Sequence, residues 1–372
     1  MWFNRLCSAA LLAATVAAAP RAWALSADGG GVAHEHPAAN DVHRAADPVH
    51  VVATLPVYAE ITKEIGGDQV EVKAIADPHE DEHFVRPKPS FAADIRRADL
   101  FVTTGLDLEL WVPPLLDKAG NAKVSEGGPG YVTAYTGIHL LEVPTAADRA
   151  EGDVHIYGNP HLVTDPLNAI QVARNITAGL KRVSPDRAAV WDKGLETFTD
   201  KIYRRLFGPA LVDMVGGPTL EQLAHSGKLM SFLQNTPYKG QPLINSLGGW
   251  LAAAAPFRGK KVICYHKNWA YFQDRFQVTC ADYVEPKPGI PPTPGHVVQL
   301  IREMKDQHIG VIMAADYFGE TKVKTTADRA GARYVMMPME PGDARTPTYF
   351  DVVDHWVNGL AQAFGTAAAA DH

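Results

Sequence analysis

The sequence has no apolar run long enough to cross a lipid bilayer. The longest run near its N-terminus extends from Ala9 to Ala19, whereas a membrane-spanning helix needs roughly 18 apolar residues. Positive charge is also not in excess, because 35 Lys and Arg residues stand against 42 Asp and Glu residues in a chain of 372. This acidic balance argues against nucleic acid as a partner.

Cysteine is scarce, with three residues in the whole chain. Cys7 precedes the first apolar run, so it is not placed like the acylated cysteine of a bacterial lipoprotein. Cys264 and Cys280 lie in the strand-like runs "KVICYH" and "FQVTCADYV", separated by one short helix. They could be two buried thiols, but an exported protein meets oxidising conditions and we favour a disulfide.

The N-terminus predicts export. Residues 1–24 combine Arg5, an apolar run and the small-residue end Ala22-Trp23-Ala24, which is the pattern of a cleaved signal peptide. We therefore expect a soluble periplasmic protein. Cleavage of the signal peptide would remove two arginines and change the formal net charge from −7 to −9.

A leader without hydrophobic periodicity follows at 25–48 and is expected to be disordered. The histidines in and just after it could capture metal loosely or simply belong to a solvated segment; they are His34, His36, His43 and His50.

From residue 49 onwards, short apolar runs alternate with helical stretches. This order predicts an α/β fold in which parallel sheets carry helices on both faces. Because about 350 residues exceed what one core usually serves, we expect two lobes joined by a long rigid backbone helix and only modest closure on ligand. The predicted boundaries are 49–184 for the N-terminal α/β lobe, 185–210 for the linker helix and 211–370 for the C-terminal α/β lobe. Asp165 followed by Pro166, and Ser184 followed by Pro185, predict two helix starts.

Ligands in open α/β sheets bind beyond the carboxyl ends of the strands. Four metal-competent side chains occupy such places, two in each predicted lobe: His83, His161, His266 and Asp316. Three imidazoles with one carboxylate suit Zn²⁺, with Mn²⁺ as an alternative, and do not suit Ca²⁺ or Mg²⁺. A single histidine of this kind is a weak indication of a metal site. The prediction depends on all four side chains having the same kind of position relative to the strands.

Several motifs around these residues resemble a known family, the zinc and manganese receptors among the periplasmic binding proteins of bacterial ABC importers. The matching elements, in chain order, are "HFVRPKPS", "ADLFVTTGLDLELW", "GNPHLVTDP", "YHKNWAYF" and "EPKPGIPP". The resemblance covers roughly residues 49–360. It implies two lobes joined by a backbone helix, with the metal held in the cleft between them.

The resemblance also implies the ligands, which fall on His83, His161, His266 and Asp316. In the family the first ligand stands four residues before one proline and six before a second, and His83 fits Pro87 and Pro89. His79 follows Asp-Pro as the family ligand does, so it is the rival, and "HEDE" resembles a four-residue insertion. Glu320 is the corresponding rival of Asp316.

Other nearby side chains have two readings each. The acids Glu80, Asp81 and Glu82 could concentrate cations at the cleft or form a solvated loop. His155 could assist the site, although we expect it to be structural. Glu285 either orients a ligand histidine or is an ordinary turn residue.

The function implied is high-affinity capture of zinc, or of manganese, and delivery to the permease of an ABC importer by a monomeric protein, with a periplasmic metallochaperone as a further potential partner. It is not that of an enzyme, because four ligands leave no open position for an activated water. A zinc hydrolase with Glu80 or Glu82 as general base is the alternative, although no H-E-x-x-H motif is present. A purely structural metal is the third option.

Overall fold

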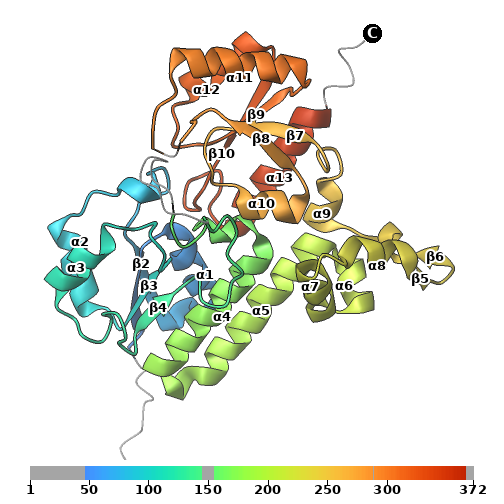
Figure 1. Ribbon diagram of the computed structural model, residues 1–372. Helices are drawn as coiled ribbons and strands as arrows, with labels where there is room; N and C mark the ends of the chain where they lie inside the picture. The colour runs from blue at the N-terminus through green and yellow to red at the C-terminus, as the bar shows by residue number, and fades with distance from the viewer. Residues whose placement is uncertain (1–46, 145–154, 288, 366–372) are drawn as a thin grey trace, which may run out of the picture. The chain divides into compact units, whose positions relative to one another are not determined.

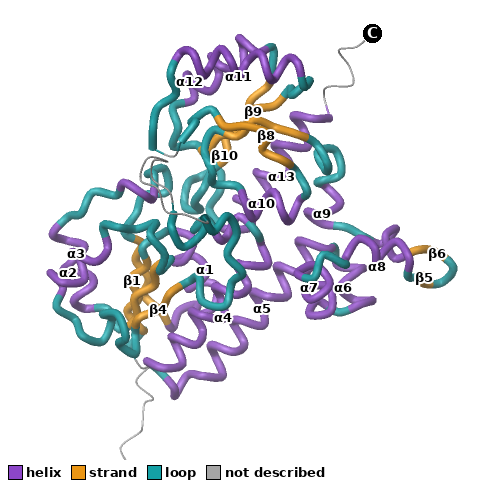
Figure 2. Tube along the Cα trace, in the orientation of Figure 1, coloured by secondary structure: helices purple, strands orange, loops and turns teal. Residues whose placement is uncertain are grey.

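The computed structural model describes residues 47–144, 155–287 and 289–365. The predicted signal peptide at 1–24 and nearly all of the predicted leader at 25–48 lie outside these residues. Two parallel four-stranded sheets with flanking helices dominate the described part of the chain (Figures 1 and 2), as the alternating pattern predicted. None of the described helices is both long and apolar enough to cross a membrane.

The first sheet belongs to the N-terminal lobe and has the order β2-β1-β3-β4. Its strands are β1 (Val49–Ala53), β2 (Val70–Ala74), β3 (Leu100–Thr103) and β4 (Tyr131–Thr133). The helices of this lobe are α1 (Pro56–Gly66), α2 (Pro89–Arg97), α3 (Val112–Ala119) and α4 (Pro166–Val183). All four residues of the central strand β3 are buried, as expected for a parallel strand covered on both faces.

Helix α4 begins where the sequence predicted, because Asp165 accepts a hydrogen bond from the backbone N–H of Leu167 and Pro166 occupies the first turn. The second predicted start differs. Pro185 opens a short 3₁₀ turn, and the long helix α5 (Ala188–Phe207) starts after it. Helix α5 lies within the predicted linker at 185–210.

The second sheet belongs to the C-terminal lobe and has the order β10-β9-β7-β8. Its strands are β7 (Lys261–Cys264), β8 (Thr279–Tyr283), β9 (Val311–Ala315) and β10 (Arg333–Met337). Its helices are α9 (Gly249–Ala253), α10 (Ala270–Phe276), α11 (Pro294–Asp306), α12 (Glu320–Ala330) and α13 (Tyr349–Gly365). The switch in strand order lies between β7 and β9, so the ends of these strands open onto the same crevice.

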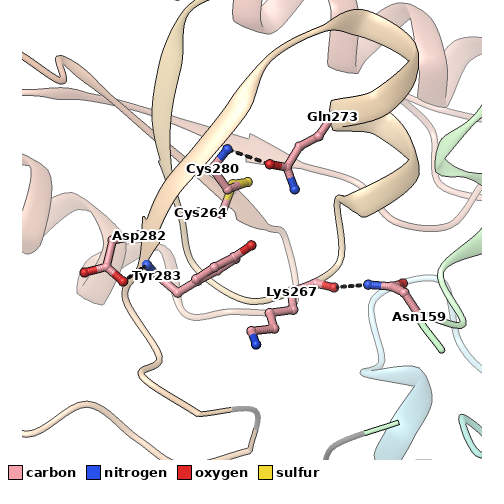
Figure 3. The surroundings of a disulfide bond; sticks show 7 residues. All are labelled: Asn159, Cys264, Lys267, Gln273, Cys280, Asp282 and Tyr283. Atoms are coloured by element: carbon pink, nitrogen blue, oxygen red, sulfur yellow. Dashed lines mark hydrogen bonds between the residues drawn. A yellow bond between two sulfur atoms is a disulfide. The ribbon is translucent and has the colours of Figure 1, made fainter. Parts of the chain in front are cut away.

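The favoured disulfide is confirmed. Cys264 and Cys280 are bonded, with their Cα atoms 5.4 Å apart (Figure 3). The bond joins β7 to its neighbour β8, and the N–H of Cys280 is also held by the Gln273 side chain at 2.7 Å. The disulfide therefore fixes β7 two residues before His266.

Between α5 and α9 the chain makes an excursion through residues 208–248, a stretch that its sequence pattern left unassigned. It consists of α6 (Pro209–Val215), α7 (Gly217–His225), α8 (Leu229–Asn235), the small hairpin of β5 (Pro237–Tyr238) and β6 (Gln241–Pro242), and a 3₁₀ turn at Leu243–Ser246. Its two ends meet, because the N–H of Gly248 donates to the carbonyl of Phe207 at 2.9 Å. A Cβ on Gly208 would lie 2.6 Å from the Cα of Gly248, so this crossing requires glycine.

Candidate metal site

His83 lies in the loop that follows β2, in a 3₁₀ turn spanning Glu82–Phe84. Asp81 fixes this residue twice: its carboxylate accepts the N–H of His83 at 3.1 Å and faces the ring Nδ1 at 2.7 Å. The indole N–H of Trp111 donates to the carbonyl of Glu82 at 2.9 Å and holds the turn from behind. The two prolines of "HFVRPKPS" then lead into α2.

His161 is a buried residue immediately before the turn that opens α4. Its backbone N–H donates to Oδ1 of Asn159 at 3.0 Å, and its ring Nδ1 faces Oε1 of Glu82 at 3.0 Å. Its Nε2 atom is buried and has no hydrogen-bond partner among the described residues. A buried nitrogen left in this way costs free energy unless something else binds it.

His266 follows β7 by two residues and is also buried. Its Nδ1 lies 2.8 Å from Oε2 of Glu285. This geometry matches the first of the two roles considered for Glu285, which is to orient a ligand histidine.

His155 approaches the same place from the loop before "GNPH". Its Nδ1 lies 3.0 Å from Oδ1 of Asp107, and its Nε2 lies 3.1 Å from Nε2 of His83. Two imidazole nitrogens that face each other this closely repel through their lone pairs unless a proton or a cation lies between them. Ligands bound to zinc at 2.0–2.1 Å in tetrahedral geometry are about 3.3 Å apart.

The four rings converge. The centroid of the His83 ring lies 5.2 Å from that of His155, 5.3 Å from that of His161 and 5.7 Å from that of His266. Ring nitrogens of His83, His161 and His266 all lie within 4.8 Å of one another. The structure thus brings together the three histidines that the sequence singled out. His155 is outside this group of mutually close atoms, as Asp316 is, but its ring lies directly beside that of His83.

Each imidazole has a carboxylate at Nδ1, in the pairs His83–Asp81, His155–Asp107, His161–Glu82 and His266–Glu285. A carboxylate at Nδ1 favours the tautomer with its proton there, which leaves the Nε2 lone pair free to bind a metal. This outer shell also sets the ring orientation.

The electrostatics favour neutral imidazole at the centre. Burial, followed by the neighbouring His83 and His155, lowers the pKa of His161 well below its usual value. Burial by itself would raise the pKa of Asp81, but the hydrogen bond and charge of His83 outweigh it, so the pKa of Asp81 is lowered and this carboxyl is ionised at neutral pH. Burial raises the pKa of Glu82, the carboxyl beside His161, although the charge of His83 opposes this. A neutral imidazole whose Nδ1 is held by a carboxyl group is a suitable ligand for a divalent ion.

Asp316 lies directly after β9, as expected, but it is not in the group of mutually close ligand atoms. Its Oδ2 lies 3.2 Å from Nδ1 of His79, the rival of His83. His79 is about half exposed, and its Nε2 lies 3.8 Å from Asp343. The other oxygen of Asp316 is buried without a hydrogen-bond partner among the described residues.

Sequence reasoning missed three features of this site. His155 was expected to be structural, and Asp107 was not singled out. Asp81 and Glu82 were considered as an acidic loop rather than as partners of two different histidines. Their position directly beside His83 was the one local signal of a role in the site.

Comparisons with known proteins agree with the resemblance. The family model described as "Zinc-uptake complex component A periplasmic" (ZnuA) matches residues 51–204 and 247–363. The iron-binding protein YfeA of Yersinia pestis is 23% identical over 332 residues, which span 88% of this chain and 90% of that protein.

Two further relatives match more locally. The manganese ABC transporter substrate-binding lipoprotein PsaA of Streptococcus pneumoniae is 29% identical over 156 residues, or 41% of this chain and 47% of PsaA. The zinc-binding lipoprotein AdcA of the same species is 29% identical over 171 residues, or 44% of this chain and 33% of AdcA.

Solved structures show the same fold. A crystal structure of ZnuA has a TM-score of 0.61 at 19% identity and covers 85% of this chain and 99% of its own. A periplasmic metal-binding protein from Candidatus Liberibacter asiaticus has a TM-score of 0.58 at 17% identity, with coverage of 85% and 99%. The chain therefore belongs to the zinc-uptake component A family, whose members are metal-binding substrate-binding proteins of ABC transporters and not enzymes.

Proposed function

We propose that this protein captures a zinc ion in the periplasm with the Nε2 atoms of His83, His155, His161 and His266. The observation that carries the proposal is the buried, unpartnered Nε2 of His161, towards which three further imidazoles converge. Four nitrogen donors match the tetrahedral preference of zinc. Zinc is thus the proposed cargo, which the protein delivers to the permease of an ABC importer.

The fourth ligand distinguishes zinc from the manganese alternative. Manganese prefers carboxylate and water oxygen, whereas imidazole suits zinc. Asp316, the fourth ligand expected from the sequence, would supply an oxygen if its carboxylate turned from His79 to the ion. His155 instead already faces His83 at 3.1 Å, and this contact supports the all-nitrogen set.

The remaining features of the function are proposals of the same kind. The family model is described as periplasmic and PsaA and AdcA are named as lipoproteins, and the predicted signal peptide supports a cleaved, freely soluble periplasmic form. We propose that the protein acts as a monomer and that a periplasmic metallochaperone is a potential second partner. The hydrolase alternative loses support, because the family consists of substrate-binding proteins and because Glu82, one of its two candidate bases, is engaged with His161.

Metal binding by His79→Ala and His83→Ala variants, measured side by side with zinc and manganese in competition, tests the proposal. We expect the His83 variant to lose most of its zinc affinity and the His79 variant to retain it. Tighter binding of manganese than of zinc by the unaltered protein would overturn the choice of metal. Retention of zinc affinity in the His83 variant would overturn the choice of ligand.

A further inference from the structure

Asn159 lies between two of the four histidines and contacts the backbone at both. Its Oδ1 accepts the N–H of His161 at 3.0 Å, and its Nδ2 donates to the carbonyl of Lys267 at 2.8 Å (Figure 3). Lys267 directly follows His266. A single buried side chain therefore joins the His161 turn of the N-terminal lobe to the His266 turn of the C-terminal lobe.

The segment that carries His161 is tied to the C-terminal lobe at three further points. The hydroxyl of Tyr271, on α10, donates to the carbonyl of Asn159 at 2.7 Å. The guanidinium of Arg275, also on α10, makes a two-pronged contact with Asp165 at 2.9 and 2.8 Å, and both side chains are buried. The hydroxyl of Tyr349, on α13, donates to the carbonyl of Val163 at 2.7 Å.

None of these contacts requires a metal ion. A buried two-pronged ion pair is costly to break, because separation of the partners leaves buried charges uncompensated. The His161 turn is therefore held against the C-terminal lobe by the protein itself. We therefore expect His161 and His266 to keep their spacing whether or not the site is loaded.

His83 and His155 are supported differently. Their orienting carboxylates, Asp81 and Asp107, both belong to the N-terminal lobe, and the two residues lie in loops. The loop of His83 contacts the C-terminal lobe through His79, which lies against Asp316 while about half exposed, and it contacts His161 through the buried carboxyl of Glu82. Exposed ion pairs of this kind contribute little to stability.

We propose that Asn159 is a positioning residue that holds His161 and His266 as a fixed half of the site, and that metal enters and leaves past His83 and His155. This inference rests on the proposed function, because it concerns the same four histidines. It differs from a clamshell mechanism, in which the lobes would separate His161 from His266 to release the ion. Here His161 and His266 stay together while the ion is exchanged.

Two backbone amides offer a matched test. The N–H of His161 donates to the side chain two residues before it, Asn159, and the N–H of His83 donates in the same way to Asp81. Asn159, which accepts the N–H of His161, is hydrogen-bonded to the opposite lobe. Asp81, which accepts the N–H of His83, belongs to the same loop as His83. In metal-free protein, we expect hydrogen exchange at His161 to be slower than at His83 by at least tenfold.

The second experiment compares alanine substitutions at two asparagines. Asn121 has the same local pattern as Asn159, because it accepts the N–H of Lys123 at 3.1 Å and donates to the carbonyl of Ala98 at 2.8 Å, but it lies wholly within the N-terminal lobe. Asn159→Ala should raise the zinc dissociation constant about 10–100-fold, as loss of an outer-shell partner does, and should speed exchange at His161. Asn121→Ala should lower thermal stability and leave the zinc constant within about twofold.

Equal exchange rates at His161 and His83 in the metal-free protein would overturn the proposal, as would equal zinc constants for the two asparagine variants. The exchange comparison needs no metal, so it decides the inference even if the protein failed to bind zinc. Failure of zinc binding would instead count against the proposed function alone.

Discussion

The carboxylate of Glu82 lies 3.0 Å from Nδ1 of His161, although Glu82 is the sequence neighbour of His83. His83 takes its own carboxylate from Asp81. The "HEDEH" stretch therefore contributes one proposed ligand and the orienting groups of two, so the apparent insertion in the family motif forms part of the site.

We predict that Glu82→Gln weakens zinc binding about 10–100-fold, because a neutral amide is a weaker partner for the Nδ1–H of His161 than a carboxylate. Competition with a chromogenic chelator measures the change. Glu80→Gln is the control, since Glu80 lies in the same loop and its side chain makes no hydrogen bond or ion pair with the described residues. Similar constants for the two variants would count against an orienting role for Glu82.

The fourth ligand can be identified with a second pair of variants. If His155 binds the ion, His155→Ala should lower zinc affinity by more than the roughly 10–100-fold expected for an outer-shell residue, and Asp316→Ala should have a smaller effect. Titration calorimetry on the metal-free proteins measures both. The reverse order would assign the fourth position to Asp316.

Glu60 gives a pH prediction independent of the metal. Burial, followed by the nearby Glu64, raises the pKa of Glu60 to about 7. The folded protein therefore binds a proton that the unfolded chain releases near pH 4.3, so the free energy of unfolding falls as pH rises from about 4.3 to 7. Glu60→Gln removes the titrating group and with it this decrease in the free energy of unfolding. The free energy of unfolding of the variant minus that of the unaltered protein should therefore be about 3 kcal/mol larger at pH 8 than at pH 4.

Urea unfolding at the two pH values measures that difference. The exposed Glu196 on α5 supplies the control, and Glu196→Gln should show no such change with pH. A pH-independent effect of Glu60→Gln would show that its carboxyl titrates normally in the folded protein.

The disulfide should contribute measurable stability. Cys264 and Cys280 are separated by 16 positions, and closing a loop of this size stabilises a protein by about 3 kcal/mol in the chain-entropy description. Replacing both cysteines with alanine should lower the free energy of unfolding by about that amount. Reduction of the unaltered protein is the parallel measurement, and unchanged stability in both cases would contradict the prediction.

The fold was predictable because its signals are local. Buried runs such as β3 and β9, and the cap at Asp165 with Pro166 behind it, each act within a few residues. The short helices of the 208–248 excursion were not predictable, because glycines interrupt their hydrophobic pattern.

The site was predictable only in part. Strand ends gave the positions of His83 and His266, because parallel strands deliver their carboxyl ends to one edge. His161 instead stands just before the start of α4. Strand position does not decide where a side chain turns, and Asp316 lies against His79. His155 could not be placed, since its approach depends on the path of its loop and on Asp107, which is 48 positions away.

The excursion between α5 and α9 has a consequence for how the family varies. The family model matches this chain up to residue 204 and again from 247, and Phe207 and Gly248, which lie close to the two ends of this gap, are joined by a hydrogen bond. A segment that leaves and returns at one point can be gained, shortened or replaced during evolution while the strands on either side keep their register. The metal-binding body and this appendage can therefore diverge at different rates.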